Sequence, residues 1–404
     1  MEYEGHVRAR DPVEWTSLRR HVSPGRQLCS VRTWDSWYVN NDHATHRKMS
    51  AARFVVDEQI PHLAEWLGKL GTVQTVSGRA ITNELLRSTG AEALFVRSIT
   101  HVDRALLDGT NITFVGSATS GTDHVDLDAL AELGIRFASA PGSNAWAVAE
   151  YVVAMIFDII KDDEARRDIR IGIIGYGHVG SRLALAAHKL GFDVVINDPP
   201  LEEAGLLDAP SFCRVLDLPT LCETCNIVTV HTPLITTGPH PTYHLITADL
   251  LARIPDGAIV INAARGGIID ERALVSEQRS GRLTAVLDVF EDEPNIHPET
   301  LNVVKHITPH IAGYSLEAKN HASWKMLEDY LKDYPRDYPR DYLEDYREDY
   351  LEDYSKVDLR EAQLKDLLAD LLADLRGAAG VAGFEEARKA YRLRHEVLRH
   401  WVYS

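Results

Sequence analysis

Cysteine is scarce in this chain, with four residues among 404. The four show no regular spacing, so the sequence excludes a small disulfide-stapled scaffold and suits a reducing cytoplasm. Cys222 and Cys225 have the spacing of a metal or redox pair. No second pair and no histidine cluster accompanies them, so we expect no metal site and favour two buried thiols near a helix end.

Positive charge is also in deficit. Lys and Arg number 43 against 60 Asp and Glu, a net charge of −17, which argues against a broad surface for nucleic acid. Long hydrophobic runs are absent, because Glu150 and Asp158 interrupt the longest one, 145–160. The N-terminal region lacks the apolar core of a secretory signal. We therefore expect a cytoplasmic globular protein without a membrane partner, long enough for two or three domains.

Two parts of the chain lack the patterning of the rest. Residues 1–51 show no helical or strand periodicity and are expected to be a poorly ordered extension. Seven tetrapeptides that each end in Asp-Tyr begin at Leu327, and with two prolines among them they predict a low-complexity linker over 326–356. A tyrosine-phosphorylation or docking tract is the alternative. Two helices are expected within 357–404.

Between these parts, short apolar runs alternate with helical patterns, which predicts an α/β fold with parallel strands. One strand is expected over 52–58, with a helix after it that ends by Gly71. A long apolar helix over 148–160 connects two sets of strands. The further strands are expected in the runs ALFVRS, ITFVGSAT, IRFASAP, IRIGIIG, FDVVIND, NIVTVHTP, AIVINAA and TAVLDVF.

A glycine-rich turn lies between an expected strand (169–174) and an expected helix. Gly175 permits the tight turn, Gly177 lets backbone N–H groups approach a pyrophosphate, and Gly180 allows close packing of helix on sheet. The helix N-terminus favours the anion. A second strand ends at Asp198, where a carboxylate can bind the ribose hydroxyls and repel a 2′-phosphate. The sequence therefore predicts NAD as the cofactor.

Three later segments follow expected strands and carry the side chains of an acid–base reaction. They contain Arg265, the acidic run 288–294, and His310. Loops at the carboxyl ends of parallel strands are where such sheets bind ligands. Oxidation of a 2-hydroxy acid needs a base, a carboxylate that orients it, and a guanidinium that holds the substrate carboxylate. Each residue alone has an ordinary alternative as a surface arginine or a loop histidine.

With these segments, the sequence resembles the D-2-hydroxyacid dehydrogenases. The resemblance runs from about Phe54 to about Ala322 and returns over the last thirty or so residues. It is carried by the stretches FVRSIT, FVGSATSGTDHVD, APGSNAWAVAEYV, NDPP, HTPLITTGPHPTYHL, INAARGGIID, LDVFEDEPNI and TPHIAGYSLEAK. Their number and order indicate a member of the family that acts on a phosphorylated substrate.

The resemblance implies a domain plan and an assembly. A Rossmann-type NAD-binding domain (148–299) is expected as an insertion in a flavodoxin-like substrate-binding domain (52–147 and 300–325). Residues 357–404 correspond to the end of a dimerisation domain, so a homodimer is implied, although the Asp-Tyr repeats replace part of that domain.

The resemblance also assigns roles to residues. His310 is the expected proton donor and acceptor, Glu293 (the acid directly before a proline) is its partner, and Arg265 binds the substrate. The expected NAD contacts, beside the three glycines, are His178, Val179, Asp198, Thr232, Asp288 and Gly313. The expected substrate contacts are Ser98, Thr119 and Tyr314. Arg97, next to Ser98, is our own candidate for the substrate phosphate, with a structural surface arginine as the alternative.

Two other functions stay open at this point. The chain could act on phosphoglycerate or a simple 2-hydroxy acid, or it could be an NAD(H)-sensing scaffold without catalysis. A catalytically dead chain whose altered tail prevents assembly is a third possibility. Retention of Arg265, Glu293 and His310 together argues against a pure binding module, which does not need all three.

Overall fold

The computed structural model describes residues 52–160 and 168–332, together with a few residues near the C-terminus. These last residues are Ala387, Arg388, Tyr391, Arg394, His395, Glu396 and Leu398. All described residues belong to one compact unit, Ser50–Ser404. The expected extension (1–51), nearly all of the expected linker, and the two helices expected near the C-terminus lie outside the described residues.

The first sheet contains five parallel strands in the order β2-β1-β3-β4-β5, which is the flavodoxin-like order. Its strands are β1 (Ala52–Asp57), β2 (Gly71–Val76), β3 (Ala93–Val96), β4 (Phe114–Ser117) and β5 (Arg136–Ser139). Its helices are α1 (Leu63–Gly68), α2 (Asn83–Thr89), α3 (Arg104–Leu107) and α4 (Leu127–Glu132). The sequence did not indicate β2, because this edge strand, GTVQTV, is half exposed and contains no apolar run.

The second sheet contains seven parallel strands in the order β12-β11-β10-β9-β6-β7-β8. They are β6 (Arg170–Ile174), β7 (Asp193–Asn197), β8 (Cys213–Val215), β9 (Ile227–Val230), β10 (Ile259–Asn262), β11 (Thr284–Leu287) and β12 (His306–Ile307). The order reverses direction between β6 and β9, as in a Rossmann fold, so the carboxyl ends of β6 and β9 border the expected ligand position. The predicted α/β class with parallel sheets is confirmed.

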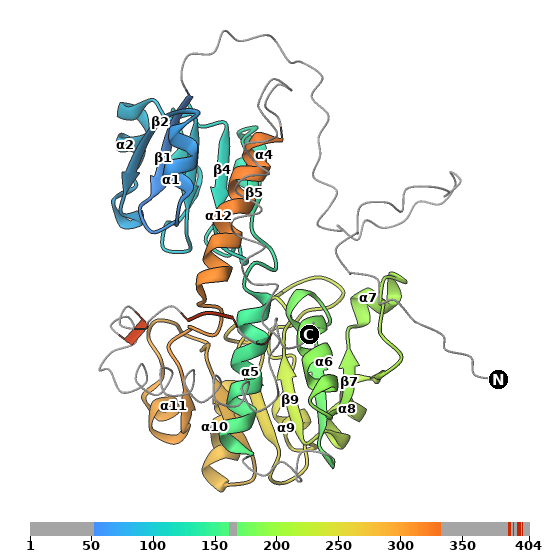
Figure 1. Ribbon diagram of the computed structural model, residues 1–404. Helices are drawn as coiled ribbons and strands as arrows, with labels where there is room; N and C mark the ends of the chain where they lie inside the picture. The colour runs from blue at the N-terminus through green and yellow to red at the C-terminus, as the bar shows by residue number, and fades with distance from the viewer. Residues whose placement is uncertain are drawn as a thin grey trace, which may run out of the picture. The chain divides into compact units, whose positions relative to one another are not determined.

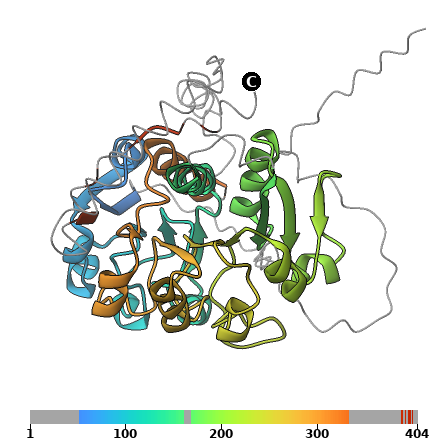
Figure 2. The same ribbon diagram turned by 90° about the horizontal axis from the view of Figure 1, so that it is seen from below.

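Helices cover both faces of the second sheet (Figure 1; Figure 2). They are α5 (Ala145–Ile159), α6 (His178–Lys189), α7 (Pro199–Glu203), α8 (Leu218–Thr224), α9 (Ala248–Leu251), α10 (Glu271–Ser280) and α11 (Pro298–Val303). None of the helices in the described part of the chain has the length and apolar character that crossing a bilayer requires.

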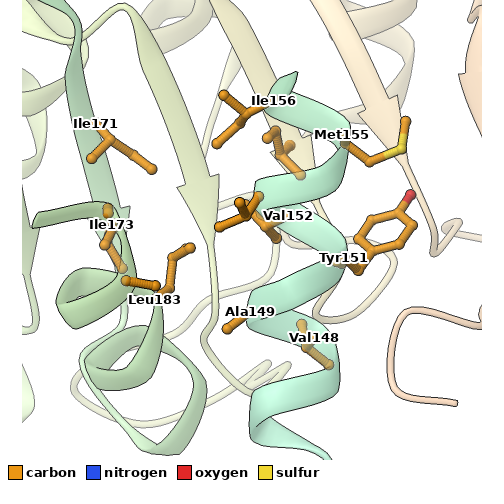
Figure 3. Close-up of a cluster of buried hydrophobic side chains, with 14 of the residues drawn as sticks. Val148, Ala149, Tyr151, Val152, Met155, Ile156, Ile171, Ile173 and Leu183 are labelled. Atoms are coloured by element: carbon orange, nitrogen blue, oxygen red, sulfur yellow. The ribbon is translucent and has the colours of Figure 1, made fainter. Parts of the chain in front are cut away.

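Successive residues of a central strand pack into different cores. Ile171 and Ile173 of β6 pack with α5 and α6, whereas Ile174 packs with the helices of the opposite face. Figure 3 shows Val152 of α5 on the side of Ile171 and Ile173, with Tyr151 on another side of the helix. Burial on both faces explains why these strands are continuous apolar runs.

The expected domain boundaries shift at two places. Strand β12 pairs with β11, so the chain remains in the second sheet as far as Ile307 rather than leaving it at 300. Helix α12 (Leu316–Leu331) then packs against the first sheet and continues through the first Asp-Tyr repeat. Leu327 and Tyr330 are buried there, so the linker expected from 326 begins later than the repeat pattern indicated. Within the first repeat, Leu327 and Tyr330 lie on one face of the helix and contact the core, which the repeat pattern alone does not indicate.

The buried position of Tyr330 gives a test of this boundary. Its ring meets those of Phe54, Phe95 and Phe114 in edge-on or tilted contacts. Tyr330→Ala should lower the free energy of unfolding by about 3 kcal/mol, since it leaves a cavity among three aromatic rings. Chemical denaturation monitored by circular dichroism measures this change. Leu301→Ala is the control, because Leu301 is 52% exposed; equal effects of the two changes would place Tyr330 outside the core.

Candidate active site

The glycine-rich turn has the geometry that a dinucleotide needs. Gly175 has φ +92°, and a Cβ atom on it would lie 2.8 Å from the carbonyl carbon of His231. A Cβ atom on Gly180 would collide with the carbonyl oxygen of Gly175, so only glycine lets α6 approach β6 this closely. A Cβ atom on Gly177 would meet no described protein atom. The open space at Gly177 fits the close approach of a pyrophosphate.

The start of α6 leaves backbone donors available beside this turn. Gly177 is the N-cap residue and supplies no side-chain acceptor, and His178 and Val179 form the first turn of the helix. The unpaired N–H groups and the dipole of this twelve-residue helix favour an anion.

Asp198 stands at the end of β7 and faces the same turn. Its Oδ2 accepts a hydrogen bond from the backbone N–H of Tyr176 (2.7 Å), and its Oδ1 accepts one from Leu201 (3.1 Å). The carboxylate is therefore held in place next to the glycine turn, as ribose binding requires. Each of its oxygens retains capacity for a further donor.

Thr232, the second residue after β9, contacts the turn from the other side. Its buried Oγ1 has no hydrogen-bond partner in the described structure, and its methyl group would lie 2.9 Å from a Cβ atom on Gly175. A buried hydroxyl without a partner costs free energy unless a ligand supplies one. The neighbouring His231 is neutral, since burial lowers its pKa to about 3. Together with the turn and Asp198, this unpaired hydroxyl fits a bound dinucleotide.

Asp288, at the end of β11, holds the loop that carries His310. Its Oδ1 accepts hydrogen bonds from Thr308 Oγ1 (2.6 Å) and Ile311 N (2.8 Å), and its Oδ2 accepts one from Ala312 N (2.9 Å). Tyr151 of α5 adds a hydrogen bond to Thr308 Oγ1 (2.8 Å). Burial raises the pKa of Asp288, and these donors oppose the rise. The residue expected to contact NAD is thus also the anchor of the loop that carries His310.

His310 and Glu293 form the expected pair. His310 Nδ1 lies 2.8 Å from Glu293 Oε2, and Glu293 Oε1 accepts a hydrogen bond from Phe290 N (2.8 Å). His310 has φ +56°, a left-handed conformation that costs about 1–3 kcal/mol in a non-glycine residue. The Nε2 atom has no hydrogen-bond partner among the described residues. The side chain is one-third exposed, so that atom can meet a substrate.

Arg265 follows β10 and reaches the loop after β4. Its Nε donates to Asp123 Oδ2 (2.9 Å), its NH1 group donates to the carbonyl of Ala264 (2.7 Å), and its NH2 group lies against Gly121. Thr119 Oγ1 donates to the carbonyl of that same Gly121 (2.8 Å). The structure therefore brings Arg265 and Thr119 to one loop, although they come from different sheets.

The Arg265 and Glu293 loops also touch each other. A Cβ atom on Gly266 would collide with the carbonyl of Phe290, the residue whose N–H holds Glu293. No hydrogen bond or ion pair joins Arg265 to Glu293 or His310 within the described residues. Gly266 and Asp123 were not singled out in the sequence; the double glycine after Arg265 is a local signal that could have identified Gly266.

The remaining expected residues lie as follows. Ser98 is exposed, and Arg97 Nε forms an ion pair with the buried Asp57 (3.1 Å), so Arg97 has the structural partner that the alternative required. A Cβ atom on Gly313 would collide with the side-chain amide of Asn144 at the start of α5. Cys222 and Cys225 are buried free thiols, and burial raises their pKa to about 12 and about 11.

A cation from the C-terminal segment supports the loop that carries His310. The buried guanidinium of Arg394 donates to the carbonyls of Ala147 (2.7 Å), Ala312 (2.7 Å) and Tyr314 (2.8 Å), and it pairs with Glu150. The carbonyls of Ala312 and Tyr314 follow His310 closely in the chain, and that of Ala147 lies in the first turn of α5. The sequence offered no local signal for this role, because the three carbonyls come from segments more than seventy residues away.

Comparisons with known proteins agree with this geometry. Residues 161–312 match the NAD binding domain of D-isomer specific 2-hydroxyacid dehydrogenases. The chain is 45% identical over 280 residues to the erythronate-4-phosphate dehydrogenase of Sodalis glossinidius, a match that covers 69% of this chain and 72% of the relative. It is 43% identical over 273 residues to the enzyme of that name from Salinibacter ruber, covering 67% and 69%.

Solved structures share the fold. The D-lactate dehydrogenase of Aquifex aeolicus, solved with NAD and lactic acid, matches with a TM-score of 0.56 at 23% identity, covering 69% of this chain and 94% of that one. The D-mandelate dehydrogenase of Rhodotorula graminis matches with a TM-score of 0.59 at 22% identity, covering 70% and 94%. At these identities the likeness concerns the fold. The cofactor that the domain family binds is NAD.

The position of Asp198 predicts the choice between NAD and NADP. Asp198→Ala should lower the ratio of kcat/KM for NAD to that for NADP by about tenfold or more, since a charged acceptor for the ribose hydroxyls is lost. Asp198→Asn keeps one side-chain acceptor, for the N–H of either Tyr176 or Leu201, and removes the charge with less loss of support than Asp198→Ala. The exposed Glu202→Ala on α7 is the control. An unchanged ratio in both Asp198 variants would remove the residue from this role.

Proposed function

The chain belongs to the D-isomer specific 2-hydroxyacid dehydrogenase family, and from this premise we propose that it oxidises 4-phospho-D-erythronate to 2-oxo-3-hydroxy-4-phosphobutanoate with NAD. One observation carries the proposal: the His310–Glu293 pair lies beside the Arg265 loop in a chain 45% identical to enzymes named for this substrate. The same names support a place in pyridoxal 5′-phosphate biosynthesis.

The proton chemistry belongs to His310 and Glu293. An ionised Glu293 accepts from Nδ1–H, which leaves the Nε2 lone pair of His310 free to take the proton of the substrate hydroxyl. The carboxylate also stabilises the imidazolium that forms, and the reverse reaction returns the same proton. NAD supplies the hydride acceptor, so that as the C2–H bond breaks, the C2–O bond becomes a carbonyl.

Arg265 is placed to bind the substrate carboxylate. Asp123 and the carbonyl of Ala264 occupy its Nε and one NH1 hydrogen, which fixes the plane of the guanidinium. The remaining N–H groups can bind the carboxylate and polarise the developing carbonyl oxygen. Thr119, on the loop that Arg265 contacts, and the exposed Ser98 are proposed to contact the rest of the substrate.

Location and assembly are proposed as well. A cytoplasmic location and a homodimer remain predictions from the sequence and the family resemblance. The Asp-Tyr repeats, which replace part of the family's dimerisation domain, weaken the second prediction.

A panel of substrates tests the proposed reaction. NADH production is measured by absorbance with 4-phospho-D-erythronate, 3-phosphoglycerate, D-lactate and D-glycerate in parallel. We expect kcat/KM for the first to exceed the others by about a hundredfold, because a site with paired polar contacts rejects substrates that leave them empty. Preference for another substrate would retain the family and reject this substrate, whereas NAD binding without turnover of any hydroxy acid would favour the sensing scaffold.

The catalytic pair is tested by substitution. His310→Asn should lower kcat by about a thousandfold and leave NADH binding, measured by fluorescence, unchanged, since a general base contributes about two to four orders of magnitude. Glu293→Gln should lower kcat less, because the base remains. His188→Asn, at the exposed end of α6, is the control. Retained turnover in His310→Asn would show that another group moves the proton.

A further inference from the structure

Two cations lie over the ring of Tyr314, four residues after His310. Lys319 Nζ lies 5.4 Å from the ring centroid, and the guanidinium carbon of Arg388 lies 5.2 Å from it. Arg388 Nε also donates a hydrogen bond to the Tyr314 hydroxyl (2.7 Å). Lys319 comes from the first turn of α12, whereas Arg388 comes from the C-terminal segment. Tyr314, which the family resemblance assigns to the substrate, is thus in contact with two positively charged side chains.

Lys319 has no carboxylate partner within the described part of the chain. Among the residues that the structure describes, no Asp or Glu lies within ion-pair distance of its ammonium, although Lys325 and Lys332 near the end of the same helix pair with Glu328 and Asp329. The side chain is only partly exposed. Burial lowers the pKa of Lys319, and the guanidinium groups of Arg97 and Arg388 lower it further, whereas Asp57 opposes them. A partly buried ammonium among other cations is stabilised by an anion.

Arg97 adds a third cation to this group. It follows β3 and pairs through Nε with Asp57 at the end of β1. Arg97, Arg388 and Asp57 are the charged groups that act on Lys319, so its ammonium is influenced by two cations and one carboxylate. The Nε contact leaves the terminal NH groups of Arg97 without a hydrogen-bond acceptor among the described residues. The ion pair therefore positions Arg97 without consuming its capacity to bind a second anion.

The cation group borders the proposed reaction site without overlapping it. Tyr314 belongs to the loop of His310, and Arg97 precedes Ser98 at the carboxyl edge of the first sheet. Arg265 contacts the loop after β4, the strand next to β3 in that sheet. A substrate that carries an anionic group at each end would place one near Arg265 and the other near Tyr314.

We propose that Lys319, Arg388 and Arg97 form a subsite that binds the phosphate of the substrate, with the Tyr314 hydroxyl and ring holding two of the cations in place. The subsite rests on the proposed function, since that function supplies a phosphorylated four-carbon acid. A phosphate dianion has the charge and the oxygen acceptors to satisfy three donors. Arg388 gives the C-terminal segment a direct part in substrate choice.

Lys319→Met is the informative substitution. It removes a charge that pairs with no carboxylate among the described residues, so none of these residues loses an ion-pair partner. Arg97→Met, by contrast, would leave Asp57 buried without its cation. We expect KM for 4-phospho-D-erythronate to rise about ten- to one-hundredfold, with kcat nearly unchanged, since a charge-assisted contact of this kind is lost. Arg388→Met should act in the same direction, and Lys319→Arg should restore most of the affinity. Lys325→Met on the same helix is the control.

Two further measurements separate charge recognition from general damage. With D-erythronate, which lacks the phosphate, kcat/KM should change less than about twofold in Lys319→Met. Inorganic phosphate should raise the Tm of the wild-type chain and should not raise that of Lys319→Met. Equal losses on both substrates, or the same phosphate-induced rise in Tm for wild type and variant, would overturn the subsite.

The phosphate measurement also distinguishes the two proposals. If the wild-type chain does not oxidise 4-phospho-D-erythronate but its phosphate-induced stabilisation depends on Lys319, the proposed function fails and the anion subsite stands. If the wild-type chain oxidises the substrate and Lys319→Met leaves its KM unchanged, the function stands and the subsite is wrong.

Discussion

The position of His310, the proposed general base, depends on one buried carboxylate. Asp288 accepts three hydrogen bonds from residues 308–312, and these bonds hold His310 in a backbone conformation that is unfavourable for a residue with a side chain. The strain is sustained because each donor would otherwise be buried without a partner. Because Asp288 fixes the backbone of the loop that carries His310, Glu293 needs to orient only the imidazole ring. The proposed acid–base chemistry of His310 therefore depends on Asp288, which takes no part in the proton transfer itself.

The far end of the chain reinforces the same loop. Arg394 donates to carbonyls at its carboxyl side and at the start of α5, and Arg388 bonds Tyr314. The buried cation is paired with Glu150, so its charge is compensated as burial demands. Residues from the second sheet, the start of α12 and the C-terminal segment thus converge at 310–319. Through these bonds the C-terminal segment reaches the loop that carries His310 and Tyr314, which are proposed to contact the substrate.

Features encoded in consecutive residues could be predicted well. The glycine turn requires closely spaced glycines between a strand and a helix, and the central strands are continuous apolar runs. Both features can therefore be recognised in the sequence. The edge strand β2 was missed because it is half polar, and the buried start of the Asp-Tyr repeats was missed because composition concealed a helical face. The partner of Arg265 was also missed: Asp123 lies 142 residues earlier, and nothing near Arg265 indicates it.

The sequence by itself determined the chemical groups of the site and the order of the strands that present them, because turn glycines, apolar periodicity and the residues that follow each strand are local properties of the chain. Tertiary structure alone decided which of those groups meet. It paired Arg97 with Asp57, gave Lys319 no carboxylate partner among the described residues, and brought Arg388 to Tyr314 across 74 residues. Ion pairing depends on distance in space, and only the packing of helices on the two sheets sets that distance.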